Sequence, residues 1–191
     1  MVVDINSDDN LPAVSAGGER RVLQPREELR LEVPFGGSSS SADTISFVLQ
    51  KGSAELYGCE LALHKLYAIP QGGVKIALFT WHGAVIDLMQ GSGVAAASST
   101  DESMSYTSDE TDCNVAYVNT HAQLESLRDD ASEALQNEND TTTTSSGGPR
   151  VLIVGPAESG KTTLSKTLIA YACKVGRTPL WVDLDPNDNA I

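Results

Sequence analysis

Residues 151–162 carry the sequence Val-Leu-Ile-Val-Gly-Pro-Ala-Glu-Ser-Gly-Lys-Thr, in which four apolar residues are followed by a glycine-containing loop. The apolar run predicts a strand that is buried on both faces, as in a parallel sheet. The residues after the loop predict a helix over 161–175 that ends at Gly176, and residues 180–184 predict a second buried strand. Together these elements form one β-α-β unit, which indicates an α/β domain that begins near residue 150.

The loop matches the pattern G-x-x-x-x-G-K-[ST] from Gly155 to Thr162. Gly155 and Gly160 permit a backbone path and close approaches that a Cβ would block. The N–H groups of such a loop surround phosphate oxygens, together with the positive end of the following helix. We expect Lys161 to bridge the β- and γ-phosphates and the Thr162 hydroxyl to ligate Mg²⁺. A glycine-rich turn without a ligand is the alternative, but the position between a buried strand and a helix favours a nucleoside triphosphate.

Two aspartates follow the second predicted strand, in the sequence Val182-Asp-Leu-Asp185. The carboxyl ends of parallel strands lie at the edge of the sheet where the phosphate loop is also found. Strand alternation places Asp183 and Asp185 on one side of the strand. A carboxylate there can hold Mg²⁺ through water or accept a proton from an attacking hydroxyl. The competing interpretation for each aspartate is a cap for a helix in the following turn.

The sequence before residue 136 has a different pattern, because apolar residues occupy every second position in 29–33 and again in 45–49. Further short strands are predicted at residues 54–57, 60–63, 75–81, 85–89 and 115–118. Residues 80–83, Thr-Trp-His-Gly, are interpreted as a turn packed on the rim of the strands. This succession of short strands and turns predicts a small β-sandwich or barrel.

The predicted domain order is a disordered tail at 1–20, a β-sandwich domain at 21–135, a linker at 136–149 and the start of a P-loop domain at 150–191. Within the sandwich domain, residues 91–112 hold five acids and no bases and are predicted to be a flexible insertion. Thr120 and Gln123 have capping-box spacing at the start of a closing helix. The apolar face of this helix is predicted to hold Leu124, Leu127, Ala131 and Leu135. One β-α-β unit cannot form an α/β domain, so we expect the chain to be a piece of a longer protein.

The net charge of −13 is concentrated in the first part of the chain. Residues 1–149 carry 8 basic and 22 acidic side chains, whereas residues 150–191 carry 5 and 4, which argues against nonspecific nucleic-acid binding by the first part. Cys59, Cys113 and Cys173 form no C-x-x-C pair and are predicted to be reduced thiols. The first residues lack the pattern of a secretory signal, and no apolar run has the length of a membrane span. We therefore expect a cytosolic or nuclear protein without membrane contact.

Several segments resemble one family in the order in which they occur. They are residues 28–33 (Glu-Leu-Arg-Leu-Glu-Val), 75–83 (Lys-Ile-Ala-Leu-Phe-Thr-Trp-His-Gly), 117–121 (Tyr-Val-Asn-Thr-His) with 124–125, 148–150, the phosphate loop and 182–185. They are similar to the Clp-type subunit of the pre-mRNA cleavage and polyadenylation machinery, in the polyribonucleotide 5′-hydroxyl-kinase family. The phosphate loop alone is not specific to this family, but the two segments at 79–83 and 117–121 make the resemblance specific.

The resemblance implies an N-terminal β-sandwich, a central P-loop domain and a small C-terminal domain, of which this chain holds the first and the opening unit of the second. It implies that Glu28 and Lys75 reach the nucleotide base, although composition alone would make each a solvated strand residue. The resemblance assigns Asp185 to Mg²⁺ or to activation of an RNA 5′-hydroxyl. It implies partners among the other subunits of the processing complex, RNA as a further ligand, and a nuclear location. The phosphate contacts are carried over to Glu158, Ser159, Gly160, Lys161, Thr162 and Thr163.

One departure from the family pattern bears on the choice between two functions. Active kinases of the family tend to follow the strand-end aspartate with Val-Gly-Gln-Gly, whereas Asp185 is followed by Pro186-Asn-Asp-Asn189. This resembles members thought to bind ATP without using it as a phosphoryl donor. We therefore expect an ATP-binding subunit of the mRNA 3′-end processing complex, with nucleotide held between the two domains. The alternative is an ATP-dependent RNA 5′-hydroxyl kinase that uses Lys161, Mg²⁺ on Thr162, and Asp185. An unrelated GTPase or ATPase switch is disfavoured, because such switches need no sandwich domain.

Overall fold

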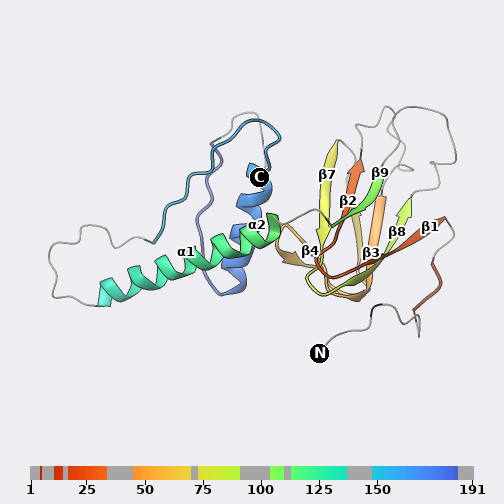
Figure 1. Cartoon of the computed structure of the whole chain (residues 1–191), viewed down its shortest axis with the longest axis horizontal. Helices are drawn as coiled ribbons and strands as arrows, with labels where there is room; N and C mark the ends of the chain where they lie inside the picture. Colours follow the sequence, from red (N-terminus) through yellow and green to blue (C-terminus); the bar gives the residue numbers. More distant parts are fainter. Residues whose placement is uncertain are drawn as a thin grey trace. The chain divides into compact units, whose positions relative to one another are not determined.

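The computed structural model describes Ile5 and residues 11–14, 17–33, 45–69, 73–90, 104–109, 113–136 and 148–184. The chain divides into two compact units, which are considered separately (Figure 1). The first unit consists of Met1–Leu56 and Glu60–Thr111, and the second of Tyr57–Cys59 and Asp112–Ile191. None of the helices in these described ranges is long and apolar enough to cross a membrane.

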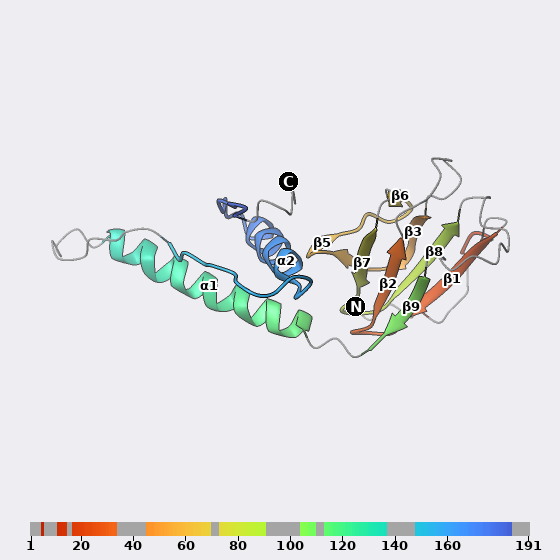
Figure 2. The same ribbon diagram turned by 90° about the horizontal axis from the view of Figure 1, so that it is seen from above.

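The first unit is a β-sandwich, as the alternating pattern predicted. One sheet has the strand order β1-β8-β3-β6 and the other has the order β5-β4-β7-β2-β9 (Figure 2). Strand β8 pairs antiparallel with β1 and β3, and β2 pairs antiparallel with β7 and β9. The strands are β1 (Gly18–Leu23), β2 (Glu28–Val33), β3 (Ile45–Gly52), β4 (Glu55–Leu56), β5 (Cys59–Glu60), β6 (Leu66–Ile69), β7 (Val74–Phe79), β8 (Ala84–Gln90) and β9 (Met104–Ser108).

The core of the sandwich consists of the alternating apolar side chains of both sheets. Leu29 and Leu31 of β2 are completely buried, and Phe47 of β3 is 1% exposed. Each large aliphatic side chain buried in this way contributes about 1.5–3 kcal/mol through the removal of apolar surface from water. Among the residues that the structure describes, the other largest fully buried side chains are Leu23, Leu49, Leu78, Ile86, Val85 and Thr80.

A turn at the rim of the sandwich connects β7 with β8, as predicted for residues 80–83. The Thr80 hydroxyl donates to the Ser53 carbonyl at 2.6 Å and accepts from the Gly83 N–H at 2.9 Å. Gly83 has φ 104°, and a Cβ there would lie 2.6 Å from Cδ1 of Ile5. The turn therefore requires glycine at this position for both its backbone angle and its packing.

Two of the sandwich strands lie where the sequence predicted no regular structure. Residues 104–108 form β9 within the segment 91–112, which was expected to be a flexible insertion, so that expectation is wrong for these five residues. Strand β1 starts at Gly18, inside the expected tail. Both strands are rich in polar or charged residues, and they are stabilised by ladders to distant strands: β9 to β2, and β1 to β8. Composition within a window does not show such long-range pairing.

Two other strand predictions also need correction. The strand expected at 60–63 ends at Glu60 as β5, and β6 follows at 66–69, because His64 turns the chain with φ 58°. The residues expected as a strand at 115–118 belong to helix α1 (Cys113–Gln136). A four-residue apolar run does not distinguish a buried strand from a helix, and here the following helical residues decide its conformation.

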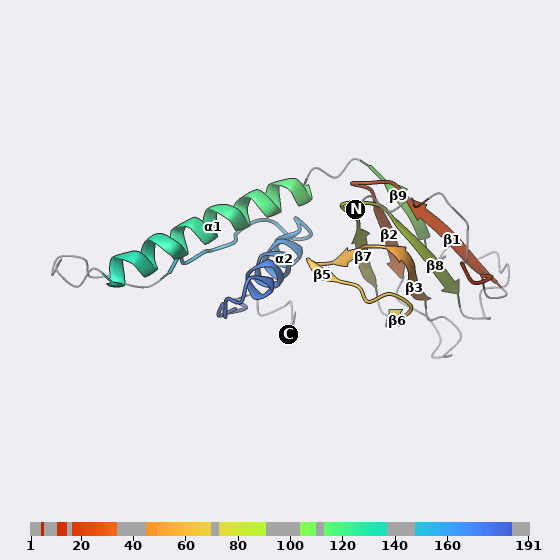
Figure 3. The same ribbon diagram turned by 90° about the horizontal axis from the view of Figure 1, so that it is seen from below.

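The second unit contains α1, α2 (Lys161–Lys174) and the segments that flank α2. Residues 112–136 cluster with this unit, whereas the helix was predicted to close the sandwich domain. Figure 3 shows the segment after Gly148 running beside α1, and a Cβ placed on Gly148 would lie 3.8 Å from Cγ of Arg128. Helix α2 lies against α1 and is close to the prediction for 161–175.

Residues 151–154 and 180–184 flank α2 where strands were predicted, but they form no strand in the structure. Their apolar side chains are largely exposed, with Leu152 73% exposed and Leu180 90% exposed. A strand requires a neighbouring strand to accept and donate its backbone hydrogen bonds, and no strand of a parallel sheet is present in the described part of the second unit. Both segments therefore lack the ladder that would make them strands.

Candidate phosphate-binding site

The loop between residue 154 and α2 has the backbone angles of an anion-binding turn. Glu158 has φ 59°, which is uncommon for a residue with a side chain, and Gly160 is left-handed with φ 83° and ψ 14°. Gly160 is the N-cap of α2, and its carbonyl accepts the first helical bond from Leu164 N at 2.9 Å. Left-handed residues between right-handed ones turn successive N–H groups toward one side, which forms a concave site for an anion.

Gly155 closes the loop at its other end. A Cβ on Gly155 would lie 2.7 Å from Oγ of Ser159, which is too close for a real Cβ contact. The first and fifth residues of the loop are therefore packed directly against each other. A side chain at Gly155 would therefore displace the Ser159 hydroxyl, and the left-handed angle of Gly160 explains the second glycine of the motif.

Lys161 extends over the loop from the first residue of α2. Its Nζ donates to the carbonyl oxygen of Pro156 at 2.7 Å. A carbonyl oxygen is a weaker partner for an ammonium group than a phosphate oxygen, so a bound phosphate would compete for the same donor. The lysine is thus held over the loop by a contact within the loop itself.

Helix α2 presents its positive end to the loop. Its first turn contains no acidic residue and its N-cap is a glycine without a side-chain hydrogen bond, whereas its last turn contains Lys174. The helix dipole favours an anion at this N-terminus and a cation at the opposite end, each by about 0.3–1 kcal/mol. The charge distribution along α2 therefore matches that of a phosphate-binding helix.

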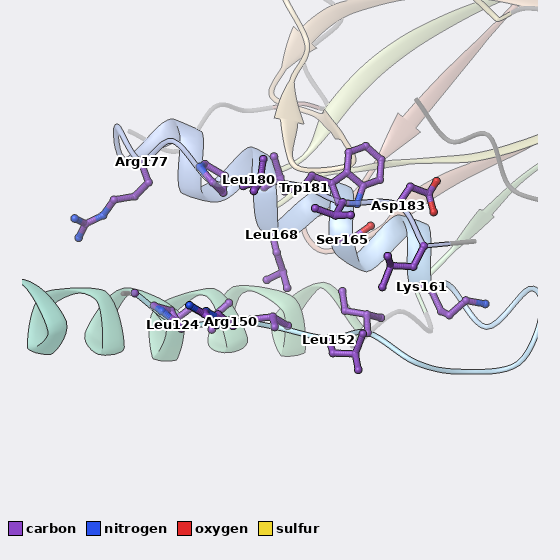
Figure 4. A pocket seen from close by; sticks show the side chains of 18 of the residues that line it. Leu124, Arg150, Leu152, Lys161, Ser165, Leu168, Arg177, Leu180, Trp181 and Asp183 are labelled. Carbon is purple, nitrogen blue, oxygen red and sulfur yellow. The ribbon is translucent and has the colours of Figure 1, made fainter. Parts of the chain in front are cut away.

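A hollow of about 770 Å³ adjoins the loop (Figure 4). Lys161, Thr162 and Asp183 all line it, so the structure brings one of the two predicted aspartates to the cavity beside the phosphate loop. Asp185 lies outside the described residues. No group of three or more His, Cys, Asp or Glu side chains suited to a metal ion occurs among the residues that the structure describes. The Thr162 hydroxyl, with a carboxylate in the same hollow, nevertheless offers the oxygen ligands that Mg²⁺ prefers.

The rest of the hollow is apolar with a basic margin. Figure 4 shows side chains from α1, from α2 and from the two flanking segments that surround it. Apolar residues of 151–154 and 180–184 form much of its lining. The basic side chains that line it, besides Lys161, are Arg128, Arg150 and Arg177.

Glu28 and Lys75 lie in the first unit, on neighbouring strands. The register pairs Lys75 with Glu32, so both predicted residues lie on the same face of the β2–β7 ladder, about 13 Å apart along it. The Glu28 residue is only 3% exposed, and its carboxylate accepts from Nε of Arg30. This bond raises the pKa of Arg30 above its ordinary value.

Lys75 has the opposite environment to Glu28. Its side chain is 73% exposed, and its Nζ lies 3.3 Å from Oε2 of Glu32. The default interpretation of a solvated strand residue therefore describes Lys75 but not Glu28. A buried carboxylate on the outer face of a sheet is unusual and needs a charged partner, which Arg30 provides.

Two family models match the chain. One describes the N-terminal beta-sandwich domain of polyadenylation factor and matches residues 22–131. The other describes the P-loop of the mRNA cleavage and polyadenylation factor CLP1 and matches residues 155–191. The chain belongs to the Clp1 family. The resemblance seen in the sequence is thereby confirmed.

Relatives from distant organisms support this assignment. The mRNA cleavage and polyadenylation factor clp1 of Emericella nidulans is 37% identical over 181 residues, which cover 88% of this chain and 30% of the relative. The CLP1 homologue of Brugia malayi is 37% identical over 169 residues, covering 88% of this chain and 34% of the relative. The Clp1-family chain thus spans about a third of the length of the curated relatives it matches.

Solved structures show the same fold. A complex described as an extended interface between Pcf11p and Clp1p, with a structural basis for ATP loss in a point mutant, matches with TM-score 0.58. It is 19% identical and covers 84% of this chain and 31% of the solved chain. The wild-type Clp1p–Pcf11p complex also matches with TM-score 0.58, at 20% identity over 86% of this chain and 31% of the other.

One cluster of the Clp1-family chain was not predicted to have a role. Glu125 of α1 accepts from Nε of Arg177 at 2.8 Å and from NH1 of Arg128, and Arg177 also bonds Asp129 at 2.6 Å. Burial acts to raise the pKa of Glu125, but the Arg177 bond and the Arg128 charge outweigh it, so the pKa lies below the ordinary value of 4.5. The spacing of these residues in the sequence could not predict the cluster, because Glu125 and Arg177 are 52 residues apart.

The segment 117–121 carried the family resemblance but no predicted role, and it lies in the second unit beside the loop. A Cβ placed on Gly160 would have the Tyr117 hydroxyl as its neighbour at 3.9 Å. The His121 ring lies 5.7 Å from the ring of Tyr171, which is buried on α2. The first turns of α1 therefore face both the phosphate loop and the helix that follows it.

Proposed function

We propose that the protein carrying this chain is an ATP-binding subunit of the machinery that cleaves and polyadenylates mRNA. Membership of the Clp1 family supports a role in mRNA cleavage and polyadenylation. The observation that supports nucleotide binding is the loop, in which left-handed Gly160 and the uncapped N-terminus of α2 form an anion site below the ammonium of Lys161. ATP would be held at this loop.

The residues of the loop have separate roles in this proposal. Backbone N–H groups of Gly155, Glu158, Ser159 and Gly160 would surround the phosphates, with that of Thr163 in the first turn of α2. Lys161 would exchange its bond to the Pro156 carbonyl for bonds to phosphate oxygens. Bound Mg²⁺ would neutralise phosphate charge, and the Thr162 hydroxyl would hold it, with Asp185 as the proposed second ligand. The proposed phosphate contacts therefore include Thr163, which directly follows the motif.

Glu28 and Lys75 are proposed to contact the nucleoside part of ATP. Their separation of about 13 Å along the ladder means that they would contact different parts of the nucleotide rather than share one atom. The exposed ammonium of Lys75 is available to move from Glu32 toward a ligand. Glu28 is buried and bonded to Arg30, so its contribution would be a fixed acceptor.

The cellular location and the partners of the protein follow from its proposed role in mRNA processing. We propose a nuclear protein, because pre-mRNA is cleaved and polyadenylated in the nucleus. Its proposed partners are other subunits of the processing complex, including a protein of the Pcf11 kind, since the solved Clp1p structures contain Pcf11p. RNA is proposed as a ligand of the P-loop part, because the acidic first part of the chain would repel phosphates.

The second candidate function is an RNA 5′-hydroxyl kinase. Lys161 and Mg²⁺ on Thr162 would stabilise charge on the transferred phosphoryl group, and Asp185 would accept the hydroxyl proton. Pro186 directly after Asp185 favours the ATP-binding subunit over the kinase. Asp183, which lines the hollow beside Lys161, is a further carboxylate for the same role.

The experiment measures ATP binding by the full-length protein. Lys161→Ala is expected to abolish binding of Mg²⁺-ATP in calorimetry, because it removes the charge that pairs with the phosphates. Lys65→Ala, which removes an equal charge from the exposed surface of the sandwich, serves as the matched control and should bind like the wild type. Unchanged affinity in Lys161→Ala would overturn the assignment of the site.

Transfer of labelled γ-phosphate to an oligonucleotide with a 5′-hydroxyl separates the two functions. We expect no transfer by a protein that binds ATP, as the Asp185-Pro186 junction indicates. Transfer that is lost in Asp185→Ala would instead favour the kinase. Transfer that persists in Asp185→Ala and is lost in Asp183→Ala would move the catalytic role to Asp183.

A further inference from the structure

Helix α1 lies near the start of the segment that contains the phosphate loop and is bonded to its end. At the incoming end, Gly148 lies close to α1, since a Cβ placed on it would be 3.8 Å from Cγ of Arg128. At the outgoing end, Arg177 follows α2 and bonds Glu125 at 2.8 Å and Asp129 at 2.6 Å. The chain between Gly148 and Arg177 includes the whole loop and the whole of α2.

One carboxylate of α1 bonds two arginines, Arg128 on the same helix and Arg177 after α2. The Oε1 atom of Glu125 accepts from Arg128, and its Oε2 atom accepts from Arg177. The Glu125 side chain is 18% exposed, and Nδ1 of His121 lies 3.8 Å from the same carboxylate. Charge-assisted bonds at a partly buried carboxylate are stronger than those at the open surface, so this link resists separation.

Arg177 is fixed rigidly to the end of α2. Its N–H donates to the Ala172 carbonyl at 2.9 Å, and the Gly176 N–H donates to the Cys173 carbonyl at 3.0 Å. These two bonds form a Schellman turn, with Gly176 left-handed at φ 81°. A restraint on the Arg177 side chain therefore acts on the whole helix, which is about 21 Å long and begins at Lys161.

The same helix α1 also reaches the beginning of α2. The Tyr117 hydroxyl lies beside Gly160, and the His121 ring packs on Tyr171. Helix α1 thus contacts α2 at the loop, along its buried face and at its far end. A stiff helix held at several points along its length has little freedom to tilt.

We infer that Glu125 is a positioning residue for the phosphate loop, which acts by joining Arg128 and Arg177. The link holds α2 in the orientation that directs its N-terminal N–H groups, and the left-handed Gly160, toward the bound phosphates. A contact that served stability alone would leave the geometry of the loop unchanged when it is removed. The inference takes its ligand from the proposed function, but the geometry of the loop can be tested without a ligand.

The test uses the full-length protein with Glu125→Gln, Arg177→Gln and the double variant. Each single change is expected to weaken ATP binding in calorimetry by about three- to tenfold, which lies within the range of coupling through a packed network. The double variant is expected to lose no more ATP affinity than the single variant that binds ATP less tightly, because both changes remove the same bond between Glu125 and Arg177. Glu133→Gln, an exposed carboxylate further along α1, is the matched charge control and should bind like the wild type.

A second measurement requires no nucleotide. Amide hydrogen exchange at residues 158–163 is expected to be faster in Glu125→Gln and Arg177→Gln than in the wild type, while exchange in β3 and β7 stays the same. Loop exchange equal to that of the wild type, together with a lowered melting temperature, would make the link purely structural and overturn the inference. Failure of the wild type to bind ATP would instead refute the proposed function, and loop exchange would still decide the inference.

Discussion

At the scale of single residues, Thr80 shows how one hydroxyl fixes a turn. The side chain is completely buried, and it bridges the Ser53 carbonyl and the Gly83 N–H. Its own backbone is also paired, since Thr80 N donates to the Glu27 carbonyl at 3.0 Å and its carbonyl accepts from Arg26 N at 2.8 Å. The turn between β7 and β8 therefore depends on the hydrogen bonds of one buried polar residue.

Thr80→Val is expected to destabilise the sandwich by about 2 kcal/mol, because the change keeps the shape but leaves a buried donor and acceptor unpaired. Urea unfolding can be followed through Trp81 fluorescence in a Trp181→Phe background. Thr80→Ser keeps the hydroxyl and should lose less stability. Thr107→Val at an exposed position of β9 is the control, and equal stability of Thr80→Val and this control would contradict the prediction.

At the scale of elements, the contact between α1 and α2 depends on pH through Glu125. Its pKa in the folded chain lies below the ordinary value of 4.5, so the folded state binds fewer protons than the unfolded state in acid. The stability from this carboxylate is therefore fully present above about pH 4.5 and is lost as the pH falls through the lowered pKa. The groups that face it are His121, Arg128 and Arg177.

The melting temperature of Glu125→Gln is expected to lie below that of the wild type at pH 7, with the difference shrinking as the pH falls below 4.5. Thermal unfolding followed by circular dichroism at 222 nm reports mainly on the helices, so it is the suitable measurement. Glu133→Gln should show no such trend. A difference that stays constant from pH 7 to the acid range would contradict the titration of Glu125.

The elements that could be predicted from sequence are those with a local signal. Alternation located β2 and β3, and the phosphate motif located the start of α2. Strands β1 and β9 carry too few apolar residues to be found locally, since they are stabilised by pairing with distant strands. The link between Glu125 and Arg177 was not predictable for the same reason, because only the packing of α1 on α2 brings its two ends together.

At the scale of the whole molecule, the apolar residues of the second unit are distributed unlike those of the first. In the sandwich most of them lie inside, whereas Val154 is 80% exposed, Leu184 is 74% exposed and Leu180 is 90% exposed. The pattern that predicted strands buried on both faces is present, but the ladder that would bury them is absent from the described residues. The Clp1 relatives are about three times as long as this chain.

The 191-residue chain is expected to bind an apolar dye such as ANS at this surface, since exposed apolar area of this kind favours association. Leu152→Ser with Leu180→Ser should lower the dye fluorescence. Leu66→Ser in the sandwich, where the leucine is 59% exposed but outside the hollow, is the matched control. Equal fluorescence in all three proteins would show that the hollow does not bind the dye.

The position of β8 in its sheet has a consequence for folding during synthesis. Strand β8 lies between β1 and β3, and β1 is an edge strand of that sheet. During translation β1 leaves the ribosome first, and it has no partner until residues 84–90 follow. Because non-local pairing of this kind is slow, the nascent chain carries an unpaired, positively charged strand through most of the synthesis of the sandwich. A shift in register at that stage would place Arg20 opposite a residue other than Asp87, with which it forms two bonds in the folded chain. The loss of these two bonds would make the shifted register less stable than the correct one.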